Sequence, residues 1–172
     1  QRRRYDQAIA LADRAVALHE HTGQPLRLAA ALATLGQIHV KLGNLDPAEA
    51  ALERSLAIAP PSRAAEIAGA VYDTLAQIAL MRGDYERAAE ALGKASSAYG
   101  SYGGKTSKWY EWSVRVITAR LSNRRGHPDE ALAMADAIVA SDLAPPPDRI
   151  EAELIAAEAL LLAGRHDEEL RR

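Results

Sequence analysis

The sequence of 172 residues contains no cysteine and no phenylalanine, and aromatic residues make up only 5% of it. Without cysteine the chain can form neither a disulfide framework nor a thiolate metal site, and it has no cysteine nucleophile. The lack of cysteine is typical of proteins that fold in a reducing compartment, so we expect a cytoplasmic location.

An excess of charge of one sign is also missing. The 21 Lys and Arg residues stand against 23 Asp and Glu residues, which gives a formal net charge of -2. This balance supplies no general attraction to the phosphates of nucleic acid, so direct nucleic-acid binding is not expected. At 48% hydrophobic residues the chain can still bury a core, which indicates a folded globular protein.

Long apolar runs are lacking as well. The most apolar stretch, residues 154–164, is interrupted by Glu158 and is much too short to cross a bilayer, so we expect no membrane span. The first five residues contain neither an initiator methionine nor the apolar core of a signal peptide. We therefore expect the chain to be a fragment of a longer protein.

Glycine is present at regular intervals. Four glycines lie 40, 43 and 38 residues apart, and three of them are followed five residues later by alanine; they are Gly43, Gly83, Gly126 and Gly164, with Ala48, Ala88 and Ala131. Self-similarity at this period is typical of stacked arrays in which one unit cannot bury its apolar face alone.

Each unit is expected to be a pair of packed helices with the glycine at its corner. Small and large apolar residues recur at helical spacing, whereas no alternation of period two indicates a strand. Glycine suits a left-handed helix C-cap, and Asn44, Asp84 and His127 after it are expected to cap the next helix. The expected helices are 4–20, 25–42, 45–59, 63–82, 85–99, 108–125, 128–141 and 147–163, with a stub from 166.

Two units resemble the tetratricopeptide repeat family. The residues that carry the resemblance are Leu35, Gly36, His39, Gly43, Leu45, Ala48, Leu52, Ser55 and Pro60 in one unit, and Leu75, Ala76, Ala79, Gly83, Asp84, Tyr85, Ala88, Leu92 and Ala95 in the next. The resemblance implies an all-α, right-handed superhelical solenoid of stacked antiparallel helix pairs. We expect one array over 1–172, truncated at both ends, with units at 4–21 (half), 25–61, 63–100, 108–142 and 147–172 (partial). The units are longer than the standard repeat of about 34 residues.

The unit that ends at Gly126 does not fit this alignment directly. Counting back from the glycine places Arg115, Thr118 and Ser122 at core positions, whereas a shift of one residue places Val114, Ile117 and Leu121 there. Because burying an unpaired arginine is costly, the pattern predicts a one-residue insertion before Gly126.

No catalytic or cofactor site is expected. The segment 100–106 resembles a phosphate-binding loop, but Tyr99 stands where its first glycine is required and a helix precedes it instead of a strand. His19 and His21 face different sides of a helix and have no third ligand nearby, so they predict no metal site. Nothing assembles a nucleophile, a base and an oxyanion site, so we expect a protein that is not an enzyme.

The family resemblance places the first helix of each unit on a concave groove. The groove residues that it implies are Thr34, Gln37, Lys41, Asp73, Thr74, Gln77, Met81, Arg115, Asn123 and Glu158, with Glu151 beside them. These side chains could be solvated or could contact a peptide, and both interpretations stay open. A cluster of aromatic residues, Tyr102, Trp109 and Trp112, either packs the joint between two units or forms a contact hot spot.

The predicted function is a non-catalytic module that binds a protein or peptide segment. Long, alanine-rich and arginine-rich units are similar to the helical-repeat arms of large bacterial transcription regulators, which implies a regulatory or signalling role. The alternatives are an architectural scaffold or spacer without a groove ligand, and part of an enzyme of unrecognised type. No cofactor is expected, and self-association through the truncated ends of the array is a further expectation.

Overall fold

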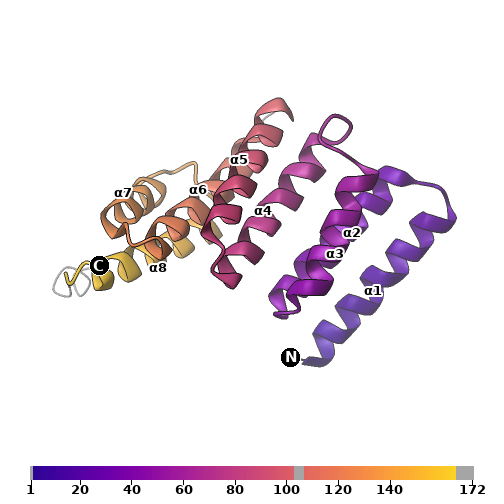
Figure 1. Cartoon of the computed structure of the whole chain (residues 1–172), viewed down its shortest axis with the longest axis horizontal. Coiled ribbons are helices and arrows are strands. Elements are labelled where there is room, and N and C mark those ends of the chain that lie inside the picture. The colour runs from indigo at the N-terminus through magenta and orange to yellow at the C-terminus, as the bar shows by residue number, and fades with distance from the viewer. Residues whose placement is uncertain (1, 103–106, 166–172) are drawn as a thin grey trace.

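The structure is a computed structural model that describes the backbone of residues 2–102 and 107–165, with the side chains of 5–101 and 110–165. Within these ranges the chain forms eight α-helices and no strand, as the sequence predicts (Figure 1). They are α1 (Arg2–His21), α2 (Pro25–Lys41), α3 (Leu45–Ile58), α4 (Ala65–Arg82), α5 (Tyr85–Tyr102), α6 (Ser107–Arg124), α7 (Pro128–Val139) and α8 (Pro146–Leu162). The stub expected from residue 166 lies outside the described residues.

The spaced glycines end helices in the predicted way. Gly83 has a φ of 78°, its amide donates to the carbonyl of Leu80, and the next amide, of Asp84, donates to the carbonyl of Ala79. This pair of hydrogen bonds is the Schellman arrangement, and it requires a left-handed residue at the corner. The same two hydrogen bonds form around each of the other glycines with positive φ, which are Gly23, Gly43, Gly126 and Gly164.

Of the three residues predicted to cap the N-termini of helices, one does so in the structure. The Oδ1 atom of Asp84 accepts a hydrogen bond of 3.1 Å from the amide of Arg87, which confirms Asp84 as a cap. The prediction was wrong for Asn44 and His127, which make no side-chain cap bond. Their ψ angles of 72° and 64° fall short of the β region from which a cap side chain reaches the first amides.

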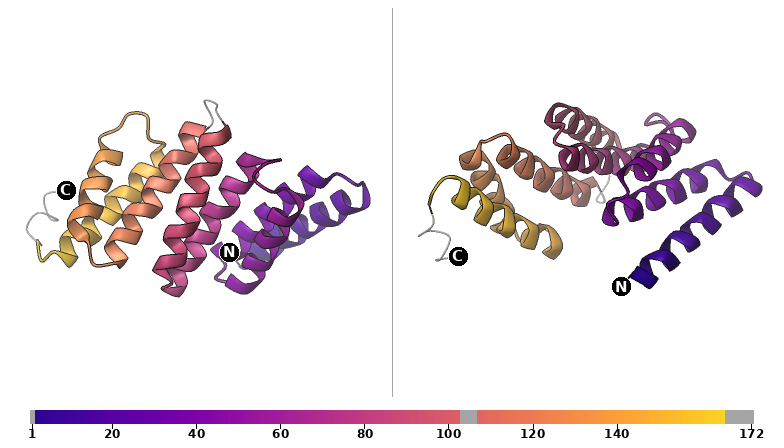
Figure 2. Two further views of the ribbon diagram at one scale, coloured as in Figure 1. Left: turned by 45° about the horizontal axis from the view of Figure 1, so that its top comes forward. Right: turned by 60° about the horizontal axis from the view of Figure 1, so that its bottom comes forward.

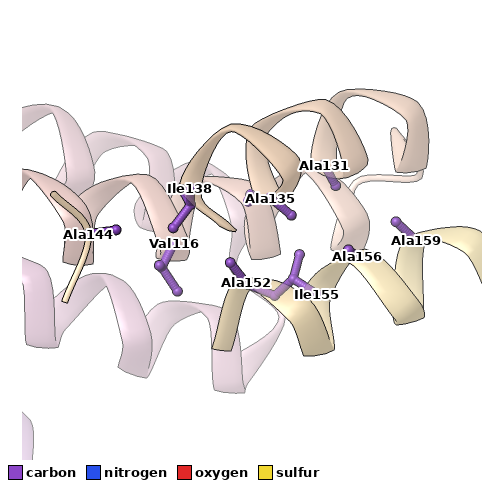
Figure 3. Close-up of a cluster of buried hydrophobic side chains, with 10 residues drawn as sticks. Val116, Ala131, Ala135, Ile138, Ala144, Ala152, Ile155, Ala156 and Ala159 are labelled. Atoms are coloured by element: carbon purple, nitrogen blue, oxygen red, sulfur yellow. The ribbon is translucent and has the colours of Figure 1, made fainter. Parts of the chain in front are cut away.

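The core is divided into clusters that each draw on consecutive helices. One cluster joins α2, α3 and α4, the next joins α4, α5 and α6, and a third joins α6, α7 and α8. In the third, Ala131, Ala135 and Ile138 of α7 face Ala152 and Ile155 of α8 (Figure 3). Each helix pair is therefore covered by the first helix of the next pair, which is the packing of a helical-repeat solenoid.

Small residues allow the helices of one pair to approach closely. A Cβ atom built on Gly36 of α2 would lie 2.6 Å from Cγ of Leu52 on α3, a distance that real Cβ atoms do not reach. Leu52 is completely buried at this point. Gly36 stands seven positions before its corner glycine, where the other units have Ala76, Ala119 and Ala157, so a small residue at this position is required by the packing.

The array curves because its two sets of helices pack differently. Successive first helices α2, α4, α6 and α8 contact one another, whereas among the described helices α3, α5 and α7 contact only first helices. The first helices therefore form a continuous inner layer. In the right-hand view of Figure 2 the chain follows an arch, with α1 and α8 at its two ends.

The predicted insertion before Gly126 is wrong. The amide of His127 donates to the carbonyl of Ser122, at the same offset at which Asp84 donates to Ala79. The sequence predicts Val114, Ile117 and Leu121 in the core, and all three are buried or half-buried. The residues at the same distances before Gly83 are Val71, Thr74 and Ile78, and they are buried too. The two units therefore share one register without any shift. The polar side chains that suggested a shift are accommodated locally: Thr118 bonds the carbonyl of Val114, and Arg115 lies over the ring of Trp112.

Replacing Gly83 by alanine should lower the free energy of unfolding by about 1 kcal/mol, because an L-residue is strained at positive φ. A Cβ at Gly83 would meet nothing within 4 Å, so the cost comes from the backbone. Gly93, exposed inside α5 and equally open, is the matched control. Gly93→Ala should raise the free energy of unfolding by about 0.5 to 1 kcal/mol in the same urea titration. Equal effects of the two substitutions would contradict the cap assignment.

Candidate functional site

The concave face is lined by the first helices, and the predicted groove residues lie on four of them. Thr34, Gln37 and Lys41 are exposed on α2, and Met81 near the end of α4 is 57% exposed. Gln37 and Gln77 occupy the same position, six residues before their glycines, and Glu158 occupies it on α8. The same position on α6 is Arg120, which the sequence prediction missed because it assumed the insertion.

A cavity of about 530 Å³ opens between the C-terminal halves of α4 and α6. Its walls combine the apolar side chains of Leu80, Met81 and Tyr85 with Gln77, Gly83 and three arginines, Arg82, Arg120 and Arg124. Gln77 and Met81 both line this cavity, and Arg120 and Arg124 occupy the corresponding positions on α6. A cavity of this size, with mixed polar and apolar walls, is suited to hold side chains of a bound segment.

The three arginines of the cavity are held by carboxylates from neighbouring helices. Arg82 pairs with Asp46 and Glu49 of α3. Arg120 pairs with Glu151 of α8, and Nη2 of Arg124 lies 3.3 Å from Oε1 of Glu158 on the same helix. Burial alone would raise the pKa of Glu49, but hydrogen bonds from Arg82 and Arg87 lower it below its ordinary value. These pairs fix the guanidinium groups as walls of the cavity and leave it without a large excess of positive charge.

Two predicted groove residues are used inside the framework. Thr74 is buried and donates a hydrogen bond of 2.8 Å to the carbonyl of Ala70 in its own helix. Asn123 is buried between α6 and α8, where its Nδ2 atom donates a bond of 3.0 Å to the carbonyl of Ile155. Both side chains stabilise the inner layer of helices at the base of the concave face.

Arg115 and Trp112 lie away from the cavity. Arg115 lines a separate hollow of about 260 Å³ between α5 and α6, together with Ser96 and Gly100. Its guanidinium carbon is 4.8 Å from the centre of the Trp112 ring, a cation–π contact. Trp112 itself is half-buried against the core cluster of α6, α7 and α8, in agreement with a packing role. The side chains of Tyr102 and Trp109 lie outside the described residues.

Asp73 is a buried carboxylate on the concave side of α4. Only 9% of the residue is exposed, and its Oδ2 atom accepts a hydrogen bond of 2.8 Å from the hydroxyl of Ser113 on α6. Its Oδ1 atom is buried without a partner. Burial, with smaller contributions from Asp148 and Glu151 of α8, raises the pKa of Asp73 to about 6, although the bond from Ser113 opposes the shift.

A stacked pair of tyrosines lies beside this carboxylate. The rings of Tyr99 on α5 and Tyr110 on α6 are parallel within 2° with centroids 4.7 Å apart, and Tyr110 donates a hydrogen bond to Glu66. Tyr99 lies on Gly69, where a Cβ would come within 2.3 Å of its ring. Burial, with the nearby charge of Asp73, raises the pKa of Tyr99, whose hydroxyl is buried without a partner.

The sequence indicated only part of this cluster. Asp73 and Glu151 were predicted on the groove from their places in the repeat, but Ser113, Asp148 and the tyrosine pair were not. These side chains come together because α4, α6 and α8 pack side by side, and no local pattern records that. The sequence did contain one signal for Asp73. The position ten residues before the corner glycine holds an apolar residue in the other units, Ala33, Val116 and Leu154, and a charged one only at Asp73.

Within residues 2–102 and 107–165 no helix is long and apolar enough to span a membrane, and no three acidic or histidine side chains gather to hold a metal ion.

The comparison with family models agrees with the fold. Models of the tetratricopeptide repeat match residues 1–60, 70–94 and 119–171, and together they cover most of the chain. The chain belongs to the tetratricopeptide repeat family, whose members generally mediate protein–protein interaction. No curated protein and no solved structure matches it.

The raised pKa of Asp73 predicts a pH-dependent stability. Because the folded pKa of about 6 lies above the ordinary 3.8, the folded chain binds more protons between these values, and the free energy of unfolding falls as pH rises through this window. Asp73→Asn keeps an acceptor for Ser113 and removes the charge. It should raise the free energy of unfolding near neutral pH by about 2 kcal/mol, and the gain should shrink toward about pH 4.

Urea unfolding at a series of pH values measures this difference. Asp142→Asn, which removes an exposed carboxylate, is the control and should follow the unmodified chain at every pH. A constant gain for Asp73→Asn over the whole range would contradict a titrating buried carboxylate.

Proposed function

We propose that this chain is a non-catalytic interaction module that binds a segment of another protein on its concave face. The observation that carries the proposal is the cavity between α4 and α6, which lies on the inner layer of first helices and exposes Met81 at its edge. Family membership supports the same function, because tetratricopeptide repeats generally mediate protein–protein interaction.

The walls of the cavity define what the bound segment contributes there. Met81 and Leu80 offer adaptable apolar surface, and Gln77 offers both a donor and an acceptor. The arginines already have carboxylate partners, so a segment gains little by bringing another acid. An apolar side chain placed on Met81, with backbone groups hydrogen-bonded to Gln77, fits this arrangement best.

The wider context proposed from the sequence is the regulatory or sensory arm of a larger bacterial regulator. Units of about 40 residues support it, since the spacing of the corner glycines exceeds that of the standard repeat. In that context the bound segment would control assembly of the regulator, and contact with DNA would be made by another part of the protein.

The methionines provide a matched test of the groove. Short peptides are selected on the chain from a displayed random library, and their affinities are then measured by fluorescence polarisation. Met81→Glu should weaken the selected peptides about tenfold or more, because it places a charge where apolar surface is buried. Met134→Glu on α7, a second helix, makes the same change on a partly exposed methionine outside the cavity and should leave the affinities unchanged.

Selection of peptides whose affinity responds equally to both substitutions would place binding elsewhere and overturn the proposal. Failure to select any peptide, with both variants folded, would favour the alternative of an architectural spacer.

A further inference from the structure

Two helices of the array have fewer neighbours than their counterparts. The second helices α3, α5 and α7 each lie between two first helices. Helix α1 also has the sequence of a second helix, since residues 5–20 align with residues 85–100 of α5, with tyrosine at the first position and alanine at the fourth. Within the described residues, however, α1 contacts only the first helix α2, and the first helix α8 contacts only α6 and α7.

One face of α8 is apolar and exposed. Ile150, Leu154 and Leu161 are 61%, 67% and 47% exposed, and Ala157 between them is half-buried. Successive spacings of four, three and four residues place these side chains on one stripe of the helix. We call this stripe the α8 surface.

In the other units the same positions are covered by neighbouring helices. Gly69 of α4 occupies the position of Ile150, fourteen residues before the corner glycine, and packs on Tyr99 of α5. Val116 of α6 occupies the position of Leu154 and is 1% exposed, in the cluster that α6 forms with α7 and α8. The internal repeat therefore defines what fits the α8 surface: a second helix, followed by another first helix.

The other end of the array exposes the matching surface, on α1. Leu11 and Leu18 are 63% and 58% exposed. Ala8 and Ala15 are half-buried, whereas the residues at their positions in α3, α5 and α7 are at most 1% exposed. The core cluster between α1 and α2 is smaller than the other three and receives no residue from a preceding first helix. We call Ala8, Leu11, Ala15 and Leu18 the α1 surface.

The charges beside the two surfaces are complementary. Between α4 and α5 the ammonium of Lys94 lies over the ring of Tyr72, 5.8 Å from its centre. The position of Lys94 is taken on α1 by Arg14. The position of Tyr72, eleven residues before the corner glycine, is taken on α8 by Glu153. Both charged side chains are exposed, and packing of α8 on α1 in the manner of α4 on α5 would bring them together.

We propose that copies of this chain associate head to tail, with α8 of one copy packed on α1 and α2 of the next. Helices α8 and α1 then form the first and second helix of one unit that two copies share, and α2 is the first helix that follows. The contact continues the interface that already joins the helices of every other unit.

Because the α1 surface and the α8 surface differ, the contact is heterologous, and each added copy leaves one of each free at the ends. The inner layer of first helices continues from one copy to the next. This inference does not depend on a ligand in the cavity between α4 and α6.

Sedimentation equilibrium over about a hundredfold range of chain concentration tests the association, because association follows mass action. The average mass of the unmodified chain should rise beyond that of a dimer. Leu154→Glu and Leu11→Glu each place a charge on one of the two surfaces, so each should weaken the association about tenfold or more. Leu143→Glu changes a side chain that is 79% exposed and lies outside both surfaces, so it should associate like the unmodified chain.

A mixture of the two variants distinguishes a heterologous contact from a symmetric one. Leu11→Glu retains the α8 surface and Leu154→Glu retains the α1 surface, so an equimolar mixture should form pairs of chains and nothing larger. Association that persists in either variant alone would indicate a symmetric contact and overturn the inference.

Exchange of the charged pair checks the register of the two helices. Arg14→Glu and Glu153→Arg should each weaken the association about two- to fivefold, the effect of one exposed ion pair replaced by like charges. The chain that carries both substitutions should associate like the unmodified one. All substituted positions are exposed, and circular dichroism with a urea transition verifies that each variant is folded.

A chain that remains single at every concentration, or a mixture of Leu11→Glu and Leu154→Glu that forms no pairs, would overturn the inference. The outcome is separable from that of the methionine test, because Met81 lies on neither surface.

Discussion

The structure depends on one constraint, which is that a pair of helices in this chain cannot cover its own apolar surface. Leu52 of α3 packs on α2, but the cluster that contains it is completed by Val71 and Ile78 of α4. The same incompleteness recurs at α6 and α8, so the units stabilise one another only in series. The first helices, which contact one another across units, form the inner layer on which the cavity between α4 and α6 lies.

The distribution of polar residues on that layer follows from this packing. Most inner positions are taken by alanine and by branched apolar side chains. The polar side chains among them bond to neighbouring groups: Thr74 and Asn123 donate to backbone carbonyls, and Asp73 accepts from Ser113. Asp73 and Asn123 each keep one buried oxygen without a partner. Asp73 differs from Asn123 in carrying a carboxylate, and burial raises the pKa of that carboxylate.

Sequence patterns predicted what local rules determine. The corner glycines were identified because a left-handed cap tolerates few other residues, and the fold class followed from their spacing. The insertion before Gly126 was predicted wrongly because the polar Arg115 and Thr118 looked incompatible with core positions, whereas a cation–π contact and a bond to the preceding turn accommodate them. The influence of Asp148 on the pKa of Asp73 could not be predicted, since the two residues lie on different units and their separation depends on how α4, α6 and α8 pack side by side.

Every contact between neighbouring units involves a first helix. The helices α2, α4, α6 and α8 contact one another in succession, and α3 and α5 also contact the first helix of the next unit, whereas within the described residues α3, α5 and α7 do not contact one another. A load applied to one end of the array is therefore carried from unit to unit through the first helices. A ligand that bridges α4 and α6 would fix the angle between their units and so alter the distance between the two ends.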